Sequence, residues 1–216
     1  RPVKFVKYLR QFGWDVSVLM AANPSVPVFD NSLLVDIPDE TNLVKARTWE
    51  PDYSLKQNMA SKKQHHQSTS LLSSVKSGCR KIARSAAGLL LQPDSQILWY
   101  PNALKAGKKL LNEMPHDAIL ATAPPYSNLI LASKLKRISG LPLIVDFRDE
   151  WDLSSKYLEN HQQDRISHLI QTRLQKSVMQ QADAIVATTK ASTQRLLDRA
   201  HQFGTDAVAR CIYNGF

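Results

Sequence analysis

The sequence contains little cysteine and little glycine, and it has no long apolar run. Its two cysteines, Cys79 and Cys211, lie far apart and form no metal-binding or redox motif. This favours a reducing, cytosolic setting. Only 7 glycines occur in 216 residues and none belongs to a G-x-G-x-x-G loop, which weighs against a dinucleotide-binding enzyme. No apolar run approaches the ~18 residues of a membrane-spanning helix, so we expect neither a membrane span nor a secretory signal.

Acidic residues are absent between Tyr53 and Pro93, whereas the rest of the chain is close to charge balance. The whole chain has a formal net charge of +9, and seven of its 28 basic residues lie in this stretch. Because the basic excess belongs to one segment, it does not indicate a nucleic-acid-binding protein. The segment also lacks aromatic residues that could stack on single-stranded bases, so we expect no nucleic-acid partner.

Residues 71–91 are predicted to form a long helix with its apolar residues on one side. The opposite side carries Lys76, Arg80, Lys81 and Arg84. The helix could pack on the sheet as an ordinary surface helix, or it could contact nucleic acid. It could also lie in the interface of an anionic membrane, where each of these cations would contribute about 1 kcal/mol.

Strands and helices alternate along the rest of the chain. The expected helices are 2–12, 102–113, 126–139, 164–181 and 191–203, and the expected strands are 15–20, 42–48, 117–122, 142–147, 183–188 and 208–213. In helix 164–181 the apolar spacing predicts a buried face of Ile166, Ile170, Leu174 and Val178. The alternation predicts an α/β fold with a Rossmann-like parallel sheet and helices on both faces. The strands that start near 117, 142 and 183 should be neighbours in that sheet.

Polar side chains follow two of these strands. Asp146, Arg148 and Asp149 lie where strand 142–147 ends, and the turn Thr122–Ser127 follows strand 117–122. Ligands of open parallel sheets bind outside the carboxyl ends of the strands. A carboxylate at Asp149 could hydrogen-bond an acceptor hydroxyl, and Arg148 could bind a phosphate bidentately. The alternative is a structural cluster of ion pairs that holds the end of the strand.

Several stretches, taken in order and spacing, resemble one known family. They are Arg1–Leu9, Phe12–Val16, Val18–Leu19, Leu98–Ala103, Ala106–Gly107, Ala121–Ser127, Asp146–Trp151, Ala182–Val186 and Ile212–Phe216. Together they resemble the amino-terminal domain of a bacterial retaining glycosyltransferase of family four, which has the two-domain GT-B fold.

The resemblance implies that residues 1–216 are the acceptor-side domain of a GT-B enzyme, truncated at both ends. Relatives have a first strand and a glycine-rich loop before the position of Arg1, and a donor-binding domain after that of Phe216. The basic loop and helix at about 53–92 would be an insertion. The implied enzyme transfers a hexosyl group from a nucleotide sugar to a lipid-linked or polysaccharide acceptor, with no cofactor or metal. It would work in the cytoplasm, peripherally at the inner face of the cell membrane, and this part alone should be inactive.

The resemblance also assigns roles. Asp149 is the expected catalytic residue, although many relatives have His where this chain has Arg148. The expected acceptor-binding residues are Thr122, Pro124, Tyr126, Ser127, Asp146, Arg148 and Trp151. Trp151 could equally serve packing. Two other function classes stay open: a non-catalytic membrane-peripheral module and a generic nucleotide-binding enzyme domain.

Overall fold

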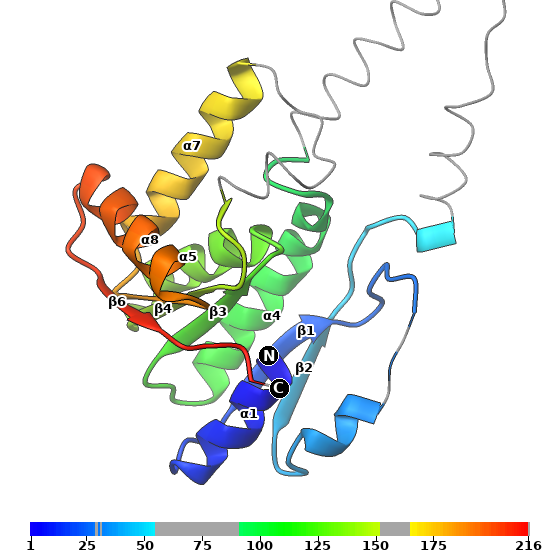
Figure 1. The fold of residues 1–216 in the computed structure, drawn as a ribbon. Helices are drawn as coiled ribbons and strands as arrows, with labels where there is room; N and C mark the ends of the chain where they lie inside the picture. Colours follow the sequence, from blue (N-terminus) through cyan, green and yellow to red (C-terminus); the bar gives the residue numbers. More distant parts are fainter. Residues whose placement is uncertain (29, 31, 55–90, 152–164, 216) are drawn as a thin grey trace, which may run out of the picture.

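The computed structural model describes residues 1–28, 30, 32–54, 91–151 and 165–215, and its strands form two parallel sheets. The larger sheet has the order β3-β4-β5-β6, and the smaller one pairs β1 with β2. Helices connect successive strands of the larger sheet, which gives an α/β, Rossmann-like architecture (Figure 1). The two ends of the chain lie close together near the middle of the molecule (Figure 1).

The larger sheet is built from three strand–helix units and a final strand. Its elements are β3 (Ile119–Ala123), α5 (Ser127–Ser139), β4 (Leu143–Phe147), α7 (Arg165–Met179), β5 (Ala184–Ala187), α8 (Lys190–Gln202) and β6 (Val208–Cys211). All three strand pairs are parallel. This confirms the prediction that the strands near 117, 142 and 183 are neighbours.

The smaller sheet lies on the other side of a break in strand pairing. Helix α1 (Pro2–Gln11) precedes β1 (Ser17–Ala21), and the 3₁₀ helix η1 (Ser32–Asp36) leads to β2 (Asn42–Ala46). Within the described residues no strand pairs with both β1 and β3. A doubly wound sheet commonly has the strand order 3-2-1-4-5-6. If the smaller sheet supplies strands 3 and 2 of that order (β2 and β1) and the larger sheet begins with strand 4 (β3), the break corresponds to the place of strand 1.

One helix connects the smaller sheet to a helix that packs on the larger sheet. Helix α4 (Tyr100–Glu113) follows the 3₁₀ helix η2 (Ser95–Trp99) and contacts β1, β2 and α5. Its Gly107 is buried, and a Cβ there would lie only 2.9 Å from Leu135 of α5 and 3.3 Å from Leu19 of β1. The absence of a side chain at Gly107 therefore lets α4 approach both neighbours closely.

The main core lies on one face of the larger sheet. Alternate strand residues such as Ala121, Val145 and Ile185 pack there with buried side chains of α5, α7 and α8. Because successive strand side chains point to opposite faces, Asp146 points away from this core. Arg1, just before α1, contacts Asp146, so α1 begins on the opposite face. Helices thus lie on both faces, as predicted.

The buried face of α7 differs from the predicted one. Val178 is buried and Leu174 is partly buried, but Ile166 is 60% exposed. Ser167 and Gln175 are buried in its place. Apolar spacing alone gave the wrong face at the start of this helix, because buried polar residues of α7 take positions that the pattern assigned to solvent.

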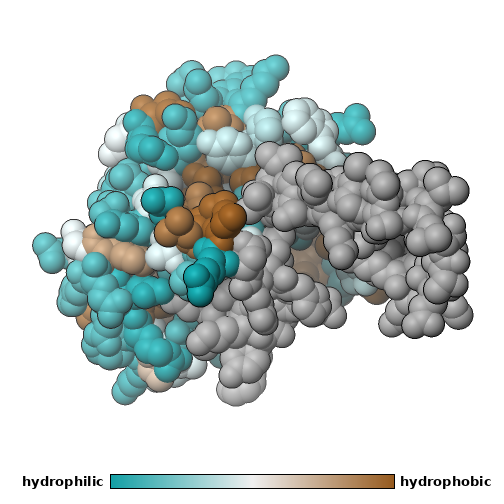
Figure 2. Space-filling model, turned by 90° about the horizontal axis from the view of Figure 1, so that it is seen from above, coloured by the Kyte–Doolittle hydropathy of each residue, from teal (hydrophilic) through white to brown (hydrophobic). Residues whose placement is uncertain are grey.

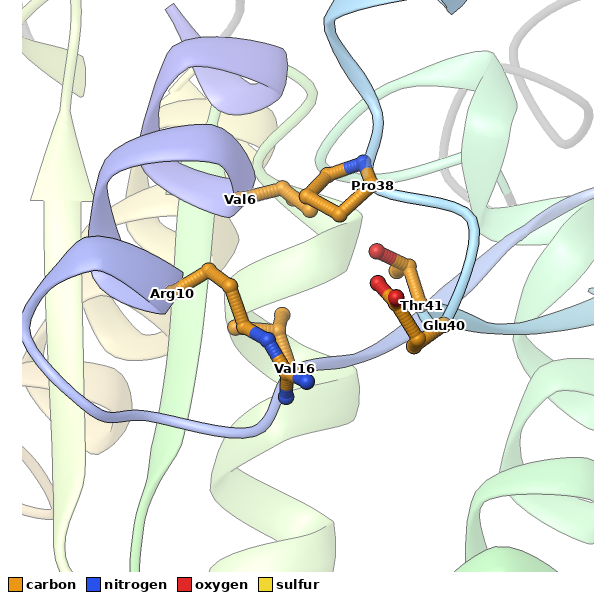
Figure 3. A pocket seen from close by; sticks show the side chains of 6 residues that line it. All are labelled: Val6, Arg10, Val16, Pro38, Glu40 and Thr41. Carbon is orange, nitrogen blue, oxygen red and sulfur yellow. The ribbon is translucent and has the colours of Figure 1, made fainter.

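A small hollow lies between α1 and the loop before β2 (Figure 3). It is lined by Val6, Arg10, Val16, Pro38, Glu40 and Thr41. Its volume of about 10 Å³ is no more than one water molecule needs. Because the loop precedes β2 and Val16 precedes β1, the hollow is at the amino-terminal edge of the strands, away from the edge where ligands are expected.

Candidate functional site

The carboxyl edge of β3 and β4 brings the predicted polar residues together. Thr122 is the register partner of Asp146 across these two parallel strands. The Thr122 hydroxyl donates a hydrogen bond of 3.0 Å to the Asp146 carboxylate. Arg148 and Asp149 follow directly after β4, and Pro124 and Tyr126 lie in the turn after β3. The parallel register is thus what turns two separate sequence signals into one local site.

Asp146 is fully buried and is neutralised by Arg1. The guanidinium of Arg1 donates from Nε to both carboxylate oxygens at 3.1 Å and from Nη2 to Oδ1 at 2.6 Å. A buried carboxylate is strongly disfavoured unless it is paired and hydrogen-bonded, and here it has both an ion pair and the Thr122 hydroxyl. Asp146 therefore supports the site from within rather than presenting a free carboxylate to a ligand.

Arg1 also binds the segment that follows β6. Its Nη1 donates to the carbonyl oxygen of Ile212 at 2.8 Å and to the side-chain oxygen of Asn214 at 3.1 Å. One guanidinium thus connects the start of α1, the end of β4 and the residues after β6. The sequence assigned Arg1 no role at the site, because its partners lie 145 or more positions away.

Asp149 carries the carboxylate that is open to solvent at this edge. Its backbone carbonyl accepts a hydrogen bond of 3.2 Å from the Tyr126 hydroxyl. The Tyr126 ring stacks on Trp151 with the ring centroids 4.5 Å apart. Both aromatic residues are buried, and the Trp151 indole donates to Gln171 of α7 at 2.5 Å. The two rings therefore fix the loop that presents Asp149.

Arg148 is partly exposed and lies against the turn after β3. Its backbone N–H donates to the Ala123 carbonyl at 2.8 Å, and its Nη2 donates to the Pro124 carbonyl. The Thr188 hydroxyl donates to the Arg148 carbonyl at 3.3 Å. The backbone of Arg148 is therefore held by both neighbouring strands.

The amino-terminal end of α5 is occupied by a carboxylate from elsewhere in the chain. Asp94 accepts hydrogen bonds from the backbone N–H groups of Tyr126 at 2.6 Å and Ser127 at 3.1 Å. Burial raises the pKa of the Asp94 carboxyl, and the hydrogen bonds from Ser127 and Tyr126 oppose that rise. Ser127, a predicted acceptor-binding residue, is 2% exposed and serves this cap.

Glu150 forms a second ion pair close by. It accepts from Arg195 Nε at 2.9 Å and from the Ser192 hydroxyl at 2.6 Å. Burial alone would raise the pKa of Glu150, but the hydrogen bonds from Arg195 and Ser192 outweigh it and hold the pKa below its usual value. The pair joins the loop after β4 to helix α8.

The structure thus groups the predicted residues by accessibility. Thr122, Pro124 and Arg148 are partly exposed and Asp149 is exposed. Tyr126, Ser127, Asp146 and Trp151 are buried. The basic residues Lys76, Arg80, Lys81 and Arg84 lie outside the described residues. On the coloured part of the face seen from above, a group of hydrophobic residues lies near the centre and hydrophilic residues cover most of the rest (Figure 2).

Two further features were sought in the described residues: a metal site and a membrane-spanning helix. It holds no group of three or more His, Cys, Asp or Glu side chains placed to bind a metal ion. In the same residues, no helix combines the length and apolar character needed to cross a bilayer. No protein-family model matches the sequence, and a search of curated proteins gave no significant match.

Proposed function

We propose that this chain is the acceptor-side domain of a glycosyltransferase that moves a sugar from a nucleotide sugar to a saccharide or lipid-linked acceptor. The observation that carries the proposal is the juxtaposition of Thr122, Asp146, Arg148 and Asp149 at the carboxyl edge of two adjacent parallel strands. This edge is where open α/β sheets bind their ligands. The sequence resemblance to family four of the retaining glycosyltransferases supports the same assignment.

In this proposal Asp149 acts on the acceptor. Its exposed carboxylate hydrogen-bonds the attacking hydroxyl and draws on its proton as the donor's diphosphate leaves. Tyr126 holds the Asp149 backbone, and Trp151 holds Tyr126 by stacking. Thr122 and Pro124 lie at the end of the neighbouring strand β3 and in the turn after it. These residues position and orient the acceptor, and we assign no protein nucleophile.

The helix end at this site argues against the generic nucleotide-binding alternative. A helix that starts after a strand commonly binds phosphate through its free N–H groups. Here the Asp94 carboxylate already occupies the N–H groups of Tyr126 and Ser127 at the start of α5. A second negative group at the same N–H groups would be repelled. We therefore place the nucleotide part of the donor in a second domain.

Replacing the exposed carboxylate tests the catalytic assignment. In the protein that joins this domain to its donor-binding domain, Asp149→Asn should lower kcat by about 100-fold or more, because general acid–base groups contribute on that order. Asp117→Asn is the matched control, since Asp117 is also exposed but precedes β3 at the opposite edge. Equal kcat values for the two variants would remove Asp149 from the mechanism.

Donor binding by residues 1–216 alone gives a second test. Isothermal titration with a panel of nucleoside diphosphate sugars should give no binding heat, because the proposal places the donor site elsewhere. A micromolar affinity for any nucleotide sugar would contradict the two-domain assignment.

We extend the proposal to a peripheral membrane location from the sequence of the basic segment. Liposomes with anionic lipid should bind the chain at low salt, and salt should weaken that binding because the Debye length falls to about 10 Å at 0.1 M. Changing Lys76, Arg80, Lys81 and Arg84 to Glu should abolish it. If the chain ignores anionic liposomes at low salt, the membrane location is wrong and we expect a soluble acceptor.

A further inference from the structure

Positive charge at the carboxyl edge is neutralised to very different extents. The Arg1 guanidinium is paired with Asp146, and the start of α5 is covered by Asp94. Arg195, which lies next to this edge, is paired with Glu150. Arg148 has no carboxylate within ion-pair distance among the residues that the structure describes. It is therefore the partly buried cation whose charge this edge leaves uncompensated.

The surroundings of Arg148 make this imbalance costly. Its Nη2 has the Pro124 carbonyl as an acceptor, but its Nε is shielded from solvent and has no hydrogen-bond partner in the described chain. A charge that is partly removed from water is destabilised unless an opposite charge or hydrogen bonds replace the lost water. The residue remains partly exposed and Nη1 is not among its buried unsatisfied atoms, so a ligand would reach the guanidinium from the Nη1 side.

We propose that Arg148 binds a phosphate group of the acceptor, so that the substrate class is a phosphate-bearing saccharide or lipid. This inference rests on the proposed function and names the acceptor chemistry. A guanidinium pairs with phosphate bidentately through parallel N–H···O bonds. A phosphate monoester carries a charge of about −1.5 to −2 at pH 7, whereas a carboxylate carries one charge and gains little at a wet surface.

Asp149 gives the phosphate a defined orientation. Its exposed carboxylate is the next residue along the chain and repels a second anion. The phosphate therefore lies on Arg148 and the neutral hydroxyl lies at Asp149. The two adjacent residues distinguish the anionic end of the acceptor from the reacting end.

Titration of residues 1–216 with two phosphate monoesters tests the contact. Hexyl phosphate represents a lipid phosphate and glucose 1-phosphate represents a sugar phosphate, and NMR of ¹⁵N-labelled arginine side chains follows the guanidinium resonances of Arg148. Both should shift the Arg148 resonance, and the tighter ligand identifies the source of the phosphate. Hexyl phosphate should bind about tenfold tighter than acetate, because the phosphate carries nearly twice the charge. Equal binding of acetate and phosphate would overturn the proposal.

Variants assign the affinity to one side chain. Arg148→Gln should weaken phosphate binding at least about tenfold, and Arg148→Lys should recover only part of it, because Lys keeps the charge but loses the bidentate geometry. Arg137→Gln is the matched control: Arg137 is an exposed arginine in the last turn of α5, at the opposite edge of the sheet. Asp149→Asn should tighten binding about two- to threefold by removing the repulsion. Unchanged affinity in Arg148→Gln, or equal losses in Arg148→Gln and Arg137→Gln, would refute the site.

A transfer assay separates this inference from the proposed function. With the donor-binding domain present, Arg148→Gln should raise KM for a phosphorylated acceptor about tenfold more than it raises KM for the dephosphorylated form. If both acceptors show the same KM in both proteins, transferase activity stands and the phosphate contact is wrong. If phosphate binds through Arg148 but no sugar is transferred to any acceptor, the contact stands and the glycosyltransferase assignment is wrong.

Discussion

Arg1 and Asp146 form a bidentate ion pair that joins the start of α1 to the end of β4 across 145 residues of sequence. The Asp146 side chain is fully buried and that of Arg1 is 9% exposed. The pair therefore lies inside the protein, where it connects the residue before α1 to strand β4 of the larger sheet. Its energetic weight differs from that of an exposed salt bridge, which contributes about 0–1 kcal/mol.

Removing one partner of this pair should be strongly destabilising. Arg1→Ala leaves a buried, unpaired carboxylate and should lower the free energy of unfolding by about 3–5 kcal/mol. Urea denaturation measures the change. The double variant Arg1→Met/Asp146→Leu removes both charges and should recover much of the loss, because no lone charge remains buried. A double variant no more stable than Arg1→Ala would show that packing, not charge, gives the pair its value.

Asp94 should make stability fall as the pH rises above about 4, which is the ordinary pKa of an Asp side chain in an unfolded chain. Burial raises the pKa of Asp94 in the folded state, so over the interval between the two pKa values the folded chain holds the proton that the unfolded chain has lost. Stability falls with rising pH wherever the folded state binds more protons. Asp94→Asn keeps an oxygen acceptor for the cap and should abolish this fall.

Unfolding free energies measured from pH 3.5 to about 7 check the sign. The difference between Asp94→Asn and the unmodified chain should grow in favour of the variant as pH rises through the interval. The exposed Asp206 provides the control, and Asp206→Asn should leave the pH dependence unchanged. A difference that grows toward low pH would mean that the carboxylate form is the one the fold prefers.

Gly140 should tolerate no ordinary side chain without loss of stability. It ends α5 in the left-handed conformation with φ of 76°, and its N–H donates to the Lys136 carbonyl at 2.7 Å. Gly140→Ala should cost about 1–2 kcal/mol, which is the strain of a Cβ in this conformation. No atom lies within 4 Å of the added Cβ, so the loss would report backbone strain rather than a clash. Arg137→Ala, in the exposed last turn of the same helix, should change stability by less than about 0.5 kcal/mol.

The Tyr126 hydroxyl should matter for the position of Asp149. Tyr126→Phe keeps the ring that stacks on Trp151 but loses the hydrogen bond to the Asp149 carbonyl, which should cost about 1 kcal/mol of stability. In the transfer assay, kcat should fall more than KM rises, because the loop that presents the carboxylate is less well fixed. Tyr8→Phe changes an exposed tyrosine of α1 and should alter neither quantity.

The fold could be predicted because its signals are local. Apolar strands followed by amphipathic helices specify parallel strand order, and the predicted ends of most described elements lie within two residues of the observed ones. The 3₁₀ helices η1 and η2 were not predicted, since single turns have no periodicity to detect. The start of α7 was assigned the wrong buried face, because Ser167 is satisfied inside the protein and no spacing rule marks such a residue.

Only the part of the site that lies at the carboxyl ends of the strands could be predicted from the sequence. Two strands with polar residues at their carboxyl ends place Thr122 beside Asp146 by register alone. The partners that set the charge of the site come from elsewhere: Arg1 from the start of the chain and Asp94 from the segment before η2. Long-range ion pairs and caps depend on tertiary packing, so the sequence around Asp146 or Tyr126 does not predict them.

The break between β1 and β3 has a consequence for handling the protein. Each of these parallel strands has one edge with no strand partner in the described chain, and their N–H and C=O groups are a template for pairing with other chains. On β3, Leu120 is 42% exposed. Preparations of residues 1–216 should therefore self-associate through strand edges as concentration rises, and the purified material should be kept dilute.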